Sequence, residues 1–289
     1  MTQGDHSQST ARRRFLIRRP DALLNQFDAG WRYLSFQVLT LNTGSREAHT
    51  GEQEVAVIPL SGSVEIRAEE ETFHLGGRPN VFDGLPEALY LPRDTSWRFT
   101  GDGPVEVAVA GAKCHQRLVP RLVTQKDYAV ETRGAGNATR QVITLLGPAF
   151  PSERLLIVEV LTPAGNWSSY PPHKHDESRA PEESPLEETY YYRLRGENGF
   201  ALQRLYSPSR SVDEAIVVLD RDLVFVPWGY HTTCAAPGYD LYYLNALAGD
   251  EHVLSAYEDP ALAWVRQSWE TQAPDPRVPL VGGDLAKRT

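Results

Sequence analysis

Short hydrophobic runs recur along most of the chain, and glycine, proline and aspartate separate them. Many of the runs are rich in β-branched and aromatic residues, which favour strands. The strands predicted from them cover residues 33–41, 55–60, 88–91, 105–110, 155–161, 189–194, 200–206, 216–219, 223–226 and 241–247. No long run with the 3.6-residue period of an amphipathic helix occurs before residues 260–270. The pattern therefore predicts an all-β fold, either a sandwich or a barrel.

The two ends of the chain lack this pattern. Residues 1–14 are polar, and residues 272–289 are rich in proline, glycine and charge, so both segments are predicted to be tails. Between the tails, a faint repeat relates the two halves: Glu188 and Gly196 have the same spacing as Glu54 and Gly62, with a hydrophobic run between each pair. The repeat predicts two related β-barrel domains, residues 15–145 and 146–271.

Aligning the two halves by this repeat shows which histidines have a counterpart in the other half. The string PWGYH, which ends at His231, has a counterpart in PRDTS, which ends at Ser96. His175 has a rough partner in His49, whereas His173 has no histidine partner. We therefore predict that the first domain keeps the scaffold but lacks a metal site, and that only the second domain carries one.

Composition narrows the class of protein. The chain has 289 residues, of which 41% are hydrophobic, enough to bury a sizeable core. A net charge of −9 argues against nucleic-acid binding, which needs a basic surface. No hydrophobic run reaches the roughly 20 residues of a membrane-spanning helix, and the N-terminus lacks the apolar region of a signal peptide. We predict a cytoplasmic protein that binds neither membranes nor nucleic acid, with Cys114 and Cys234 as buried free thiols.

Three histidines and one glutamate of the second half are candidate metal ligands. His173 and His175 lie two residues apart, so on an extended strand both imidazoles point to the same face. Glu188 begins the next predicted strand, and His231 follows the Pro-x-Gly turn of PWGYH. Imidazole nitrogens and a carboxylate suit Zn²⁺, Fe²⁺, Mn²⁺ or Ni²⁺ and leave positions open for water or substrate. Single histidines are often core or surface residues, but this combination favours a metal site.

Glu187 is the alternative to Glu188 as the carboxylate ligand. We prefer Glu188 because it matches Glu54 in the repeat and because it shares strand parity with Tyr190 and Tyr192. The prediction is that Glu188 points into the barrel and that Glu187 points outward.

The order of these motifs resembles the cupin family, although the loop DESRAPEESPLE is longer than usual and the Pro-x-Gly turn is one residue shorter. A denser set of strings resembles the bicupin family of hexuronate ketol-isomerases, which includes the 5-deoxy-glucuronate isomerases of inositol catabolism: AGNWSSYPPHKHD, LEETYYYR, GFALQR, VPWGYH and APGYDLYYLNALAG, with RGAGNATR and GLPEALYLP as weaker matches. The resemblance implies two tandem jelly-roll domains.

The reaction that this resemblance implies converts 5-deoxy-D-glucuronate to 5-dehydro-2-deoxy-D-gluconate through a metal-stabilised enediol. It implies one divalent metal per chain, with zinc the ion expected in the isolated protein and Mn, Fe or Ni as alternatives. The residues alone leave two other functions open, a metal-dependent cupin oxygenase and a non-catalytic sugar-binding cupin. They also leave open whether copies of the chain associate.

The sequence offers several candidates for the acid–base step. Tyr190 and Tyr192 lie on the inward face of the predicted strand, and Asp176 and Glu183 come from the acidic loop 176–186. We expect this loop to form a lid or rim over the cavity. A metal-bound hydroxide is a further candidate, and the sequence does not choose among these groups.

The carboxylate of a sugar acid requires a cation, preferably a planar guanidinium that can bind both oxygens. Arg204 is the first candidate, followed by Lys174 and Arg193. Gln203 and Trp167 are the remaining candidates for contact with substrate.

Overall fold

The prediction of an all-β fold is confirmed. The computed structural model describes residues 15–18 and 31–283, so the predicted tail at residues 1–14 lies outside the described residues. The described residues form three sheets and one short helix, α3 (Val265–Ser268), in the region where the sequence pattern changed to a helical period. None of the helices in these two ranges is long and apolar enough to cross a membrane.

The first half of the chain forms one eight-stranded sheet, which is strongly bent. Its 16-residue strand β4 pairs with β6 and β8 through its first part and with β5 and β7 through its last part. Gly62 lies at the bend with φ at 76°, where a Cβ would come within 2.7 Å of the Pro104 carbonyl oxygen, so only glycine fits. The strands are β2 (Leu34–Leu41), β3 (Gly44–His49), β4 (Gln53–Ala68), β5 (Glu71–Arg78), β6 (Ala88–Leu91), β7 (Ser96–Gly101), β8 (Val105–Lys113) and β9 (Arg121–Val123).

Two further sheets make up the second half. The seven-stranded sheet has the order β1-β17-β14-β19-β12-β11-β10, and the five-stranded sheet has the order β16-β15-β18-β13-β20. Their bounds are β1 (Leu16–Arg18), β10 (Val130–Arg133), β11 (Arg140–Leu146), β12 (Leu156–Thr162), β13 (Trp167–Lys174), β14 (Leu186–Leu194), β15 (Ala201–Tyr206), β16 (Asp213–Val218), β17 (Asp222–Val226), β18 (Tyr230–Ala235), β19 (Leu241–Gly249) and β20 (Tyr257–Glu258).

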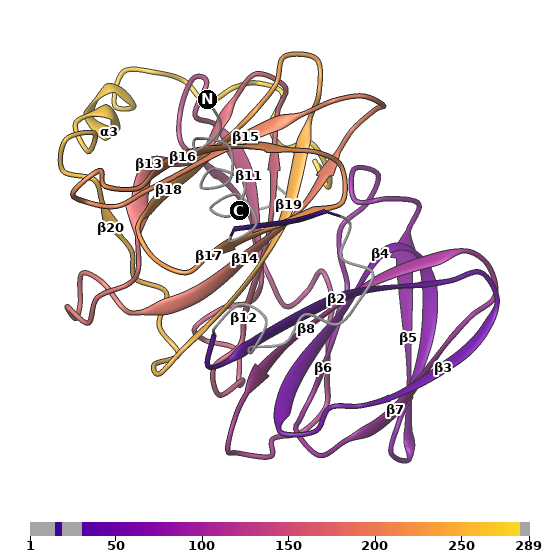
Figure 1. Cartoon of the computed structure of the whole chain (residues 1–289). Coiled ribbons are helices and arrows are strands. Elements are labelled where there is room, and N and C mark those ends of the chain that lie inside the picture. Colours follow the sequence, from indigo (N-terminus) through magenta and orange to yellow (C-terminus); the bar gives the residue numbers. More distant parts are fainter. Residues whose placement is uncertain (1–14, 19–30, 284–289) are drawn as a thin grey trace, which may run out of the picture.

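Hydrogen bonding crosses the domain boundary that we predict near residue 145. Strands β1, β10 and β11 come from the range assigned to the first domain, yet all three pair within the seven-stranded sheet. Figure 1 shows the indigo strand β1 beside β17, within the body formed by the second half. The sequence pattern locates strands but carries no information about which sheet accepts them.

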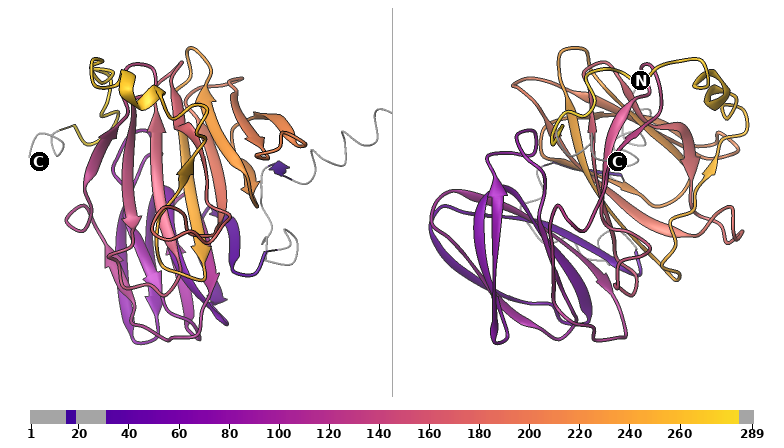
Figure 2. Two further views of the ribbon diagram at one scale, coloured as in Figure 1. Left: turned by 90° about the vertical axis from the view of Figure 1, so that its left-hand side faces the viewer. Right: turned by 180° about the vertical axis from the view of Figure 1, so that it is seen from behind.

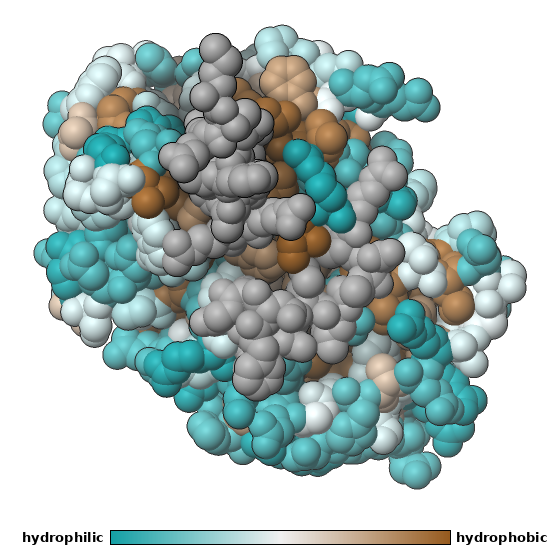
Figure 3. Space-filling model, in the orientation of Figure 1, coloured by the Kyte–Doolittle hydropathy of each residue, from teal (hydrophilic) through white to brown (hydrophobic). Residues whose placement is uncertain are grey.

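Among the described residues, three large hydrophobic cores lie between and within the two halves, beside a small cluster of three leucines. One core fills the first half, a second lies between the seven- and five-stranded sheets, and the third joins the eight-stranded sheet to the seven-stranded sheet. Figure 2 shows the two bodies side by side, and hydrophilic residues predominate along the edge of the face in Figure 3. Strand β14 is buried on both sides, with Tyr191 in the core between the halves and Tyr190 and Tyr192 in the second-half core.

Two glutamates fasten each half to the backbone of the other. Both oxygens of Glu54 accept hydrogen bonds from the N–H groups of residues 153–155, at 2.6–2.8 Å. Glu187 accepts hydrogen bonds from the N–H groups of residues 32–34, at 2.5–3.0 Å. Each glutamate thus holds the segment that leads into β12 or β2. We call these two groups the carboxylate clamps.

The clamps correct the alignment of the repeat. Glu54 and Glu187 occupy equivalent positions, so the match between Glu54 and Glu188 was wrong by one residue. The residue after Glu54 is Val55, which packs in the first-half core at the position equivalent to Glu188. The repeat therefore gave no valid support for Glu188, whereas strand parity did.

Buried ion pairs add to the contact between the halves. Arg78 of β5 donates two hydrogen bonds to Glu159 of β12, at 2.6 and 2.9 Å, and Tyr242 donates a third at 2.8 Å. Arg193 of β14 pairs with Glu106 at 2.7 Å and with Asp220 at 3.0 Å. Arg193 therefore joins the halves, and the structure does not support its assignment to the substrate.

The segment from residue 272 wraps against the second half as far as it is described. The side chain of Gln141 accepts hydrogen bonds from the N–H groups of residues 280 and 281 and donates one to the carbonyl of Val281. Val281 is buried, and Pro274 forms a β-bridge with Gly136. Residues 284–289 of the predicted tail lie outside the described residues.

Candidate active site

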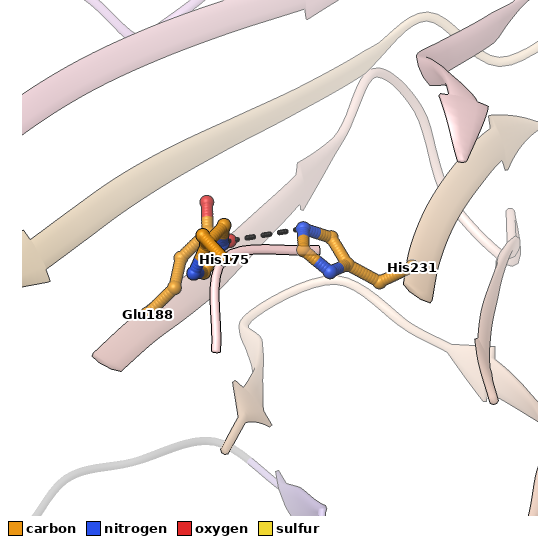
Figure 4. A group of neighbouring side chains, drawn as sticks. All are labelled: His175, Glu188 and His231. Carbon is orange, nitrogen blue, oxygen red and sulfur yellow. Dashed lines mark hydrogen bonds and ion pairs between the residues drawn. The ribbon is translucent and has the colours of Figure 1, made fainter. Parts of the chain in front are cut away.

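Three of the four predicted ligands meet at one point in the second half. His175 follows β13, Glu188 lies on β14 and His231 lies on β18. The Nε2 atoms of His175 and His231 lie 2.9 and 3.1 Å from Oε2 of Glu188, as Figure 4 shows. All three side chains are buried. They are the only such group of potential metal ligands found among the described residues.

His173 lies beside this group. Strands β13 and β18 pair so that His173 is directly opposite His231, and the two ring centroids are 4.6 Å apart. His173 and His175 face the same cavity, as expected for two residues of one strand face. In the first half, His49 lies opposite Ser96 in the same way, so His49 corresponds to His173 rather than to His175.

Backbone carbonyl oxygens orient the histidines. Nδ1 of His175 lies 2.9 Å from the carbonyl oxygen of Leu186, and Nδ1 of His231 lies 3.1 Å from that of Gly229. A carbonyl oxygen only accepts, so each Nδ1 carries the proton and donates it. This leaves the lone pair on Nε2, the atom that points at Glu188, which is the usual arrangement around a metal-binding imidazole.

The donor set fits a divalent metal. Nε2 of His231 is fully buried and makes no hydrogen bond, and its lone pair faces Oε2 of Glu188 at 3.1 Å, a costly arrangement that a bound metal ion would relieve. Burial alone would raise the pKa of Glu188, but the adjacent imidazoles of His175 and His231 lower it to about 2, so the carboxylate is ionised. Burial and the other two imidazoles hold the pKa of His173 well below its usual value, so His173 is neutral.

A cavity of about 320 Å³ opens beside this group, near the lower end of the range for small-molecule sites. One part of its wall is formed by His173, His175 and Glu188. Hydroxyl, amide and apolar groups, three arginines and a glutamate also line the cavity: Ser169, Tyr190, Tyr243, Asn245, Val142, Val158, Val160, Leu247, Leu254, Arg133, Arg140, Arg266 and Glu258.

A chain of hydroxyl groups lies on the cavity wall. The Tyr190 hydroxyl lies 3.0 Å from that of Ser169, which lies 3.2 Å from that of Tyr243. Ser168 contacts Tyr243 at 2.7 Å. Burial, followed by the charge of Glu188, raises the pKa of Tyr190 well above its usual value, so this hydroxyl stays protonated. Burial likewise raises the pKa of Tyr243.

Several residues assigned to the chemistry lie elsewhere. Tyr192 is buried and donates a hydrogen bond to Gln203 at 3.0 Å, and neither residue lines the cavity. Alternation along β14 places Tyr192 on the inner face as predicted, but two residues further from the histidines than Tyr190.

Lys174, Asp176 and Glu183 form an ionic network on the opposite face of β13. The Lys174 ammonium donates to Asp176 at 2.6 Å and to Glu183 at 2.8 Å. Asp176 also accepts from the Gly229 N–H, and Glu183 from Arg179. Because strand side chains alternate, Lys174 points away from the two histidines that flank it. The network fixes the acidic loop, and none of its members lines the cavity.

Arg204 and Trp167 point outward. Arg204 of β15 forms a two-point ion pair with Asp213, at 2.6 and 2.7 Å, and both side chains are partly exposed. Its neighbour Gln203 faces inward instead. Trp167 is 38% exposed and packs edge to face on Tyr170, which does line the cavity.

The arginines of the cavity wall were not predicted from the sequence. Arg133 and Arg140 are the first and last residues of RGAGNATR, so the motif was noticed but not used. Arg266 comes from α3, and Tyr243 from the string APGYDLYYLNALAG. None of the three arginines has a spacing that links it to the histidines.

Comparison with known proteins gives consistent matches along most of the chain. The model of the KduI/IolB family matches residues 17–265. A 5-deoxy-glucuronate isomerase from Geobacillus thermodenitrificans is 41% identical over 243 residues, which cover 83% of this chain and 89% of that protein. The crystal structure of an IolB-like protein from Salmonella typhimurium superposes with a TM-score of 0.84 and 35% identity, and covers 87% of this chain and 98% of that one. An oxalate decarboxylase from Lactobacillus farciminis, 11% identical with a TM-score of 0.61 over 84% of this chain and 85% of its own, shares the fold.

Proposed function

The chain belongs to the KduI/IolB family, and we propose that it isomerises 5-deoxy-D-glucuronate to 5-dehydro-2-deoxy-D-gluconate in inositol catabolism. The cluster of His175, Glu188 and His231 carries the proposal, because His175 and Glu188 also line a small-molecule cavity. We also propose that the reaction takes place in the cytoplasm.

We assign His173, His175, Glu188 and His231 as the ligands of one divalent ion. When bound, such an ion would supply a Lewis acid that stabilises negative charge on neighbouring substrate oxygens. The three histidines offer uncharged nitrogen donors, and Glu188 offers the single negative charge. Zinc is the first candidate, with manganese, iron and nickel as alternatives.

The reaction moves one hydrogen from C2 to C1 and one proton from O2 to O1, and it leaves the oxidation level of the whole molecule unchanged, so no redox partner is required. Tyr190 and Tyr243 remain protonated, so their hydroxyl groups act as donors to the oxygens of an enediol. Ser169 links the two hydroxyls and provides a route along which a proton can move between them. The valines and leucines of the wall exclude water from the middle of the cavity.

Turnover without oxygen tests the proposal. The metal-loaded chain is incubated with 5-deoxy-D-glucuronate under anaerobic conditions, and the product is followed by NMR. We expect complete conversion to the equilibrium mixture. A requirement for oxygen would identify an oxygenase instead. Saturable binding without turnover would identify a sugar-binding protein.

Metal binding is expected to depend on pH. Burial alone would lower the pKa of His175, but the interaction with Glu188 raises it. Protons therefore compete with the metal ion for His175 at a higher pH than they would for an ordinary histidine. We expect about one ion per chain above neutral pH and loss of the ion as the pH falls through about 6.5. Equilibrium dialysis with elemental analysis measures both. Two ions per chain, or affinity that rises on acidification, would contradict the assignment.

A further inference from the structure

Arg140 is an unpaired charge in the wall of the cavity. Its side chain belongs to a residue that is 9% exposed. Nη1 donates to the carbonyl oxygens of Ala138 and Tyr170, at 3.2 and 3.5 Å. Nε is buried without a partner. Within residues 31–283, neither a hydrogen bond from Nη2 nor an ion pair of Arg140 with a carboxylate is found. The free edge formed by Nε and Nη2 carries two parallel N–H groups.

The other charges at this part of the wall already have partners. Arg133 pairs with Glu131 at 3.0 Å, and Arg266 pairs with Glu258, which itself lines the cavity. Both of these arginines are exposed, whereas Arg140 is not. Burial lowers the pKa of Arg140, yet a guanidinium stays charged in proteins. A buried charge without a partner is costly, so an anion on the free edge of Arg140 would offset that cost.

The loop before Arg140 is shaped to hold this side chain. Gly134 has φ at 79°, and a Cβ there would lie 2.2 Å from the Ala138 carbonyl oxygen and 2.8 Å from Nη1 of Arg140. Only glycine allows this close approach. Two hydrogen bonds of 2.9 Å tie the loop to residues 273 and 275 of the C-terminal segment. The position of the guanidinium is therefore set before any ligand binds.

We propose that Arg140 is the receptor for the carboxylate of the sugar acid, with Arg133 and Arg266 adding positive charge around it. This inference rests on the proposed function. The substrate has its aldehyde at one end and its carboxylate at the other. Arg140 on β11 and Glu188 on β14 are separated by two intervening strands of the same sheet, and both line the cavity. A carboxylate on Arg140 directs the aldehyde toward the histidines.

Binding of a hexuronate and of the matching neutral sugar tests this role without turnover. Titration calorimetry compares D-glucuronate with D-glucose on the metal-loaded chain. We expect the wild type to prefer glucuronate by about 10- to 100-fold, as for a two-point, charge-assisted contact. Arg140→Gln should abolish the preference. The matched control Arg204→Gln removes the same charge from an outward-facing arginine and should retain it.

Kinetics provide the second readout. Arg140→Gln should raise KM for 5-deoxy-D-glucuronate by about 10- to 100-fold, with a smaller effect on kcat. Arg140→Lys keeps the charge but loses the parallel N–H groups, so its KM should lie between those of the wild type and Arg140→Gln. The lysine variant replaces the glutamine variant in the test if the latter does not fold. Normal turnover with KM and sugar preference unchanged in these variants would overturn the carboxylate receptor alone. A wild type that prefers glucuronate through Arg140 but shows no isomerisation would overturn the proposed function alone.

Discussion

Glu188→Gln is expected to reduce isomerase activity by about 100-fold or more and to lower metal content sharply. The change removes the one anionic ligand and places an amide 2.9 Å from Nε2 of His175. Gln has nearly the same shape as Glu, so packing should change little. Activity is measured as kcat/KM, and metal content by elemental analysis of the dialysed protein.

Glu187→Gln is the matched control, because the same chemical change is made one residue away. Glu187 accepts three backbone hydrogen bonds from residues 32–34 and does not face the histidines. We expect normal metal content and a loss of stability of about 1–2 kcal/mol. Loss of metal from Glu187→Gln with Glu188→Gln unaffected would show that the carboxylate ligand has been assigned one residue too late.

Glu159→Gln is expected to cause the largest loss of stability, about 3–5 kcal/mol. Arg78 and Glu159 are 1% and 0% exposed and form a two-point pair between the halves. With a neutral partner, the guanidinium of Arg78 remains buried without its compensating charge. Urea unfolding followed by fluorescence measures the change in the free energy of unfolding.

Glu47→Gln provides the comparison for an exposed pair. Glu47 and Arg98 form an ion pair whose side chains are 70% and 55% exposed. Water screens such a pair, so the loss should be below about 1 kcal/mol. Equal losses in the two variants would mean that the Arg78–Glu159 pair does not stabilise the contact between the halves.

The sequence predicts strands well where both faces are buried. The hydrophobic runs at 105–110 and 241–247 correspond to β8 and β19, in which nearly every residue is buried. Strands with a polar face are predicted poorly: β3 was not foreseen because most of its side chains are exposed, and β7 was not foreseen because its buried residues alternate with polar ones. Strands β13 and β18 were also missed, since proline, serine, threonine and histidine interrupt their hydrophobic pattern.

For the site, local spacing was informative and sheet order was not. His173, His175 and Glu188 come from adjacent segments, so strand parity alone places them together. Arg140 reaches the cavity only because β11 joins the sheet next to β12, a pairing that no local pattern encodes. The assignment of Arg204 to the substrate carboxylate was wrong, because β15 turns Gln203 inward and Arg204 pairs with Asp213 on the outer face.

The carboxylate clamps constrain how the chain matures on the ribosome. Glu54 is fully buried, and among the described residues of the first half its carboxylate has only the Tyr90 hydroxyl as a side-chain donor. Its three backbone donors, residues 153–155, are translated about a hundred residues later. The N–H groups of residues 32–34 likewise lack their acceptor until Glu187 has been translated. During synthesis the N-terminal half therefore emerges before the three backbone donors of Glu54 exist, and we expect it to reach its final structure only when the other half follows.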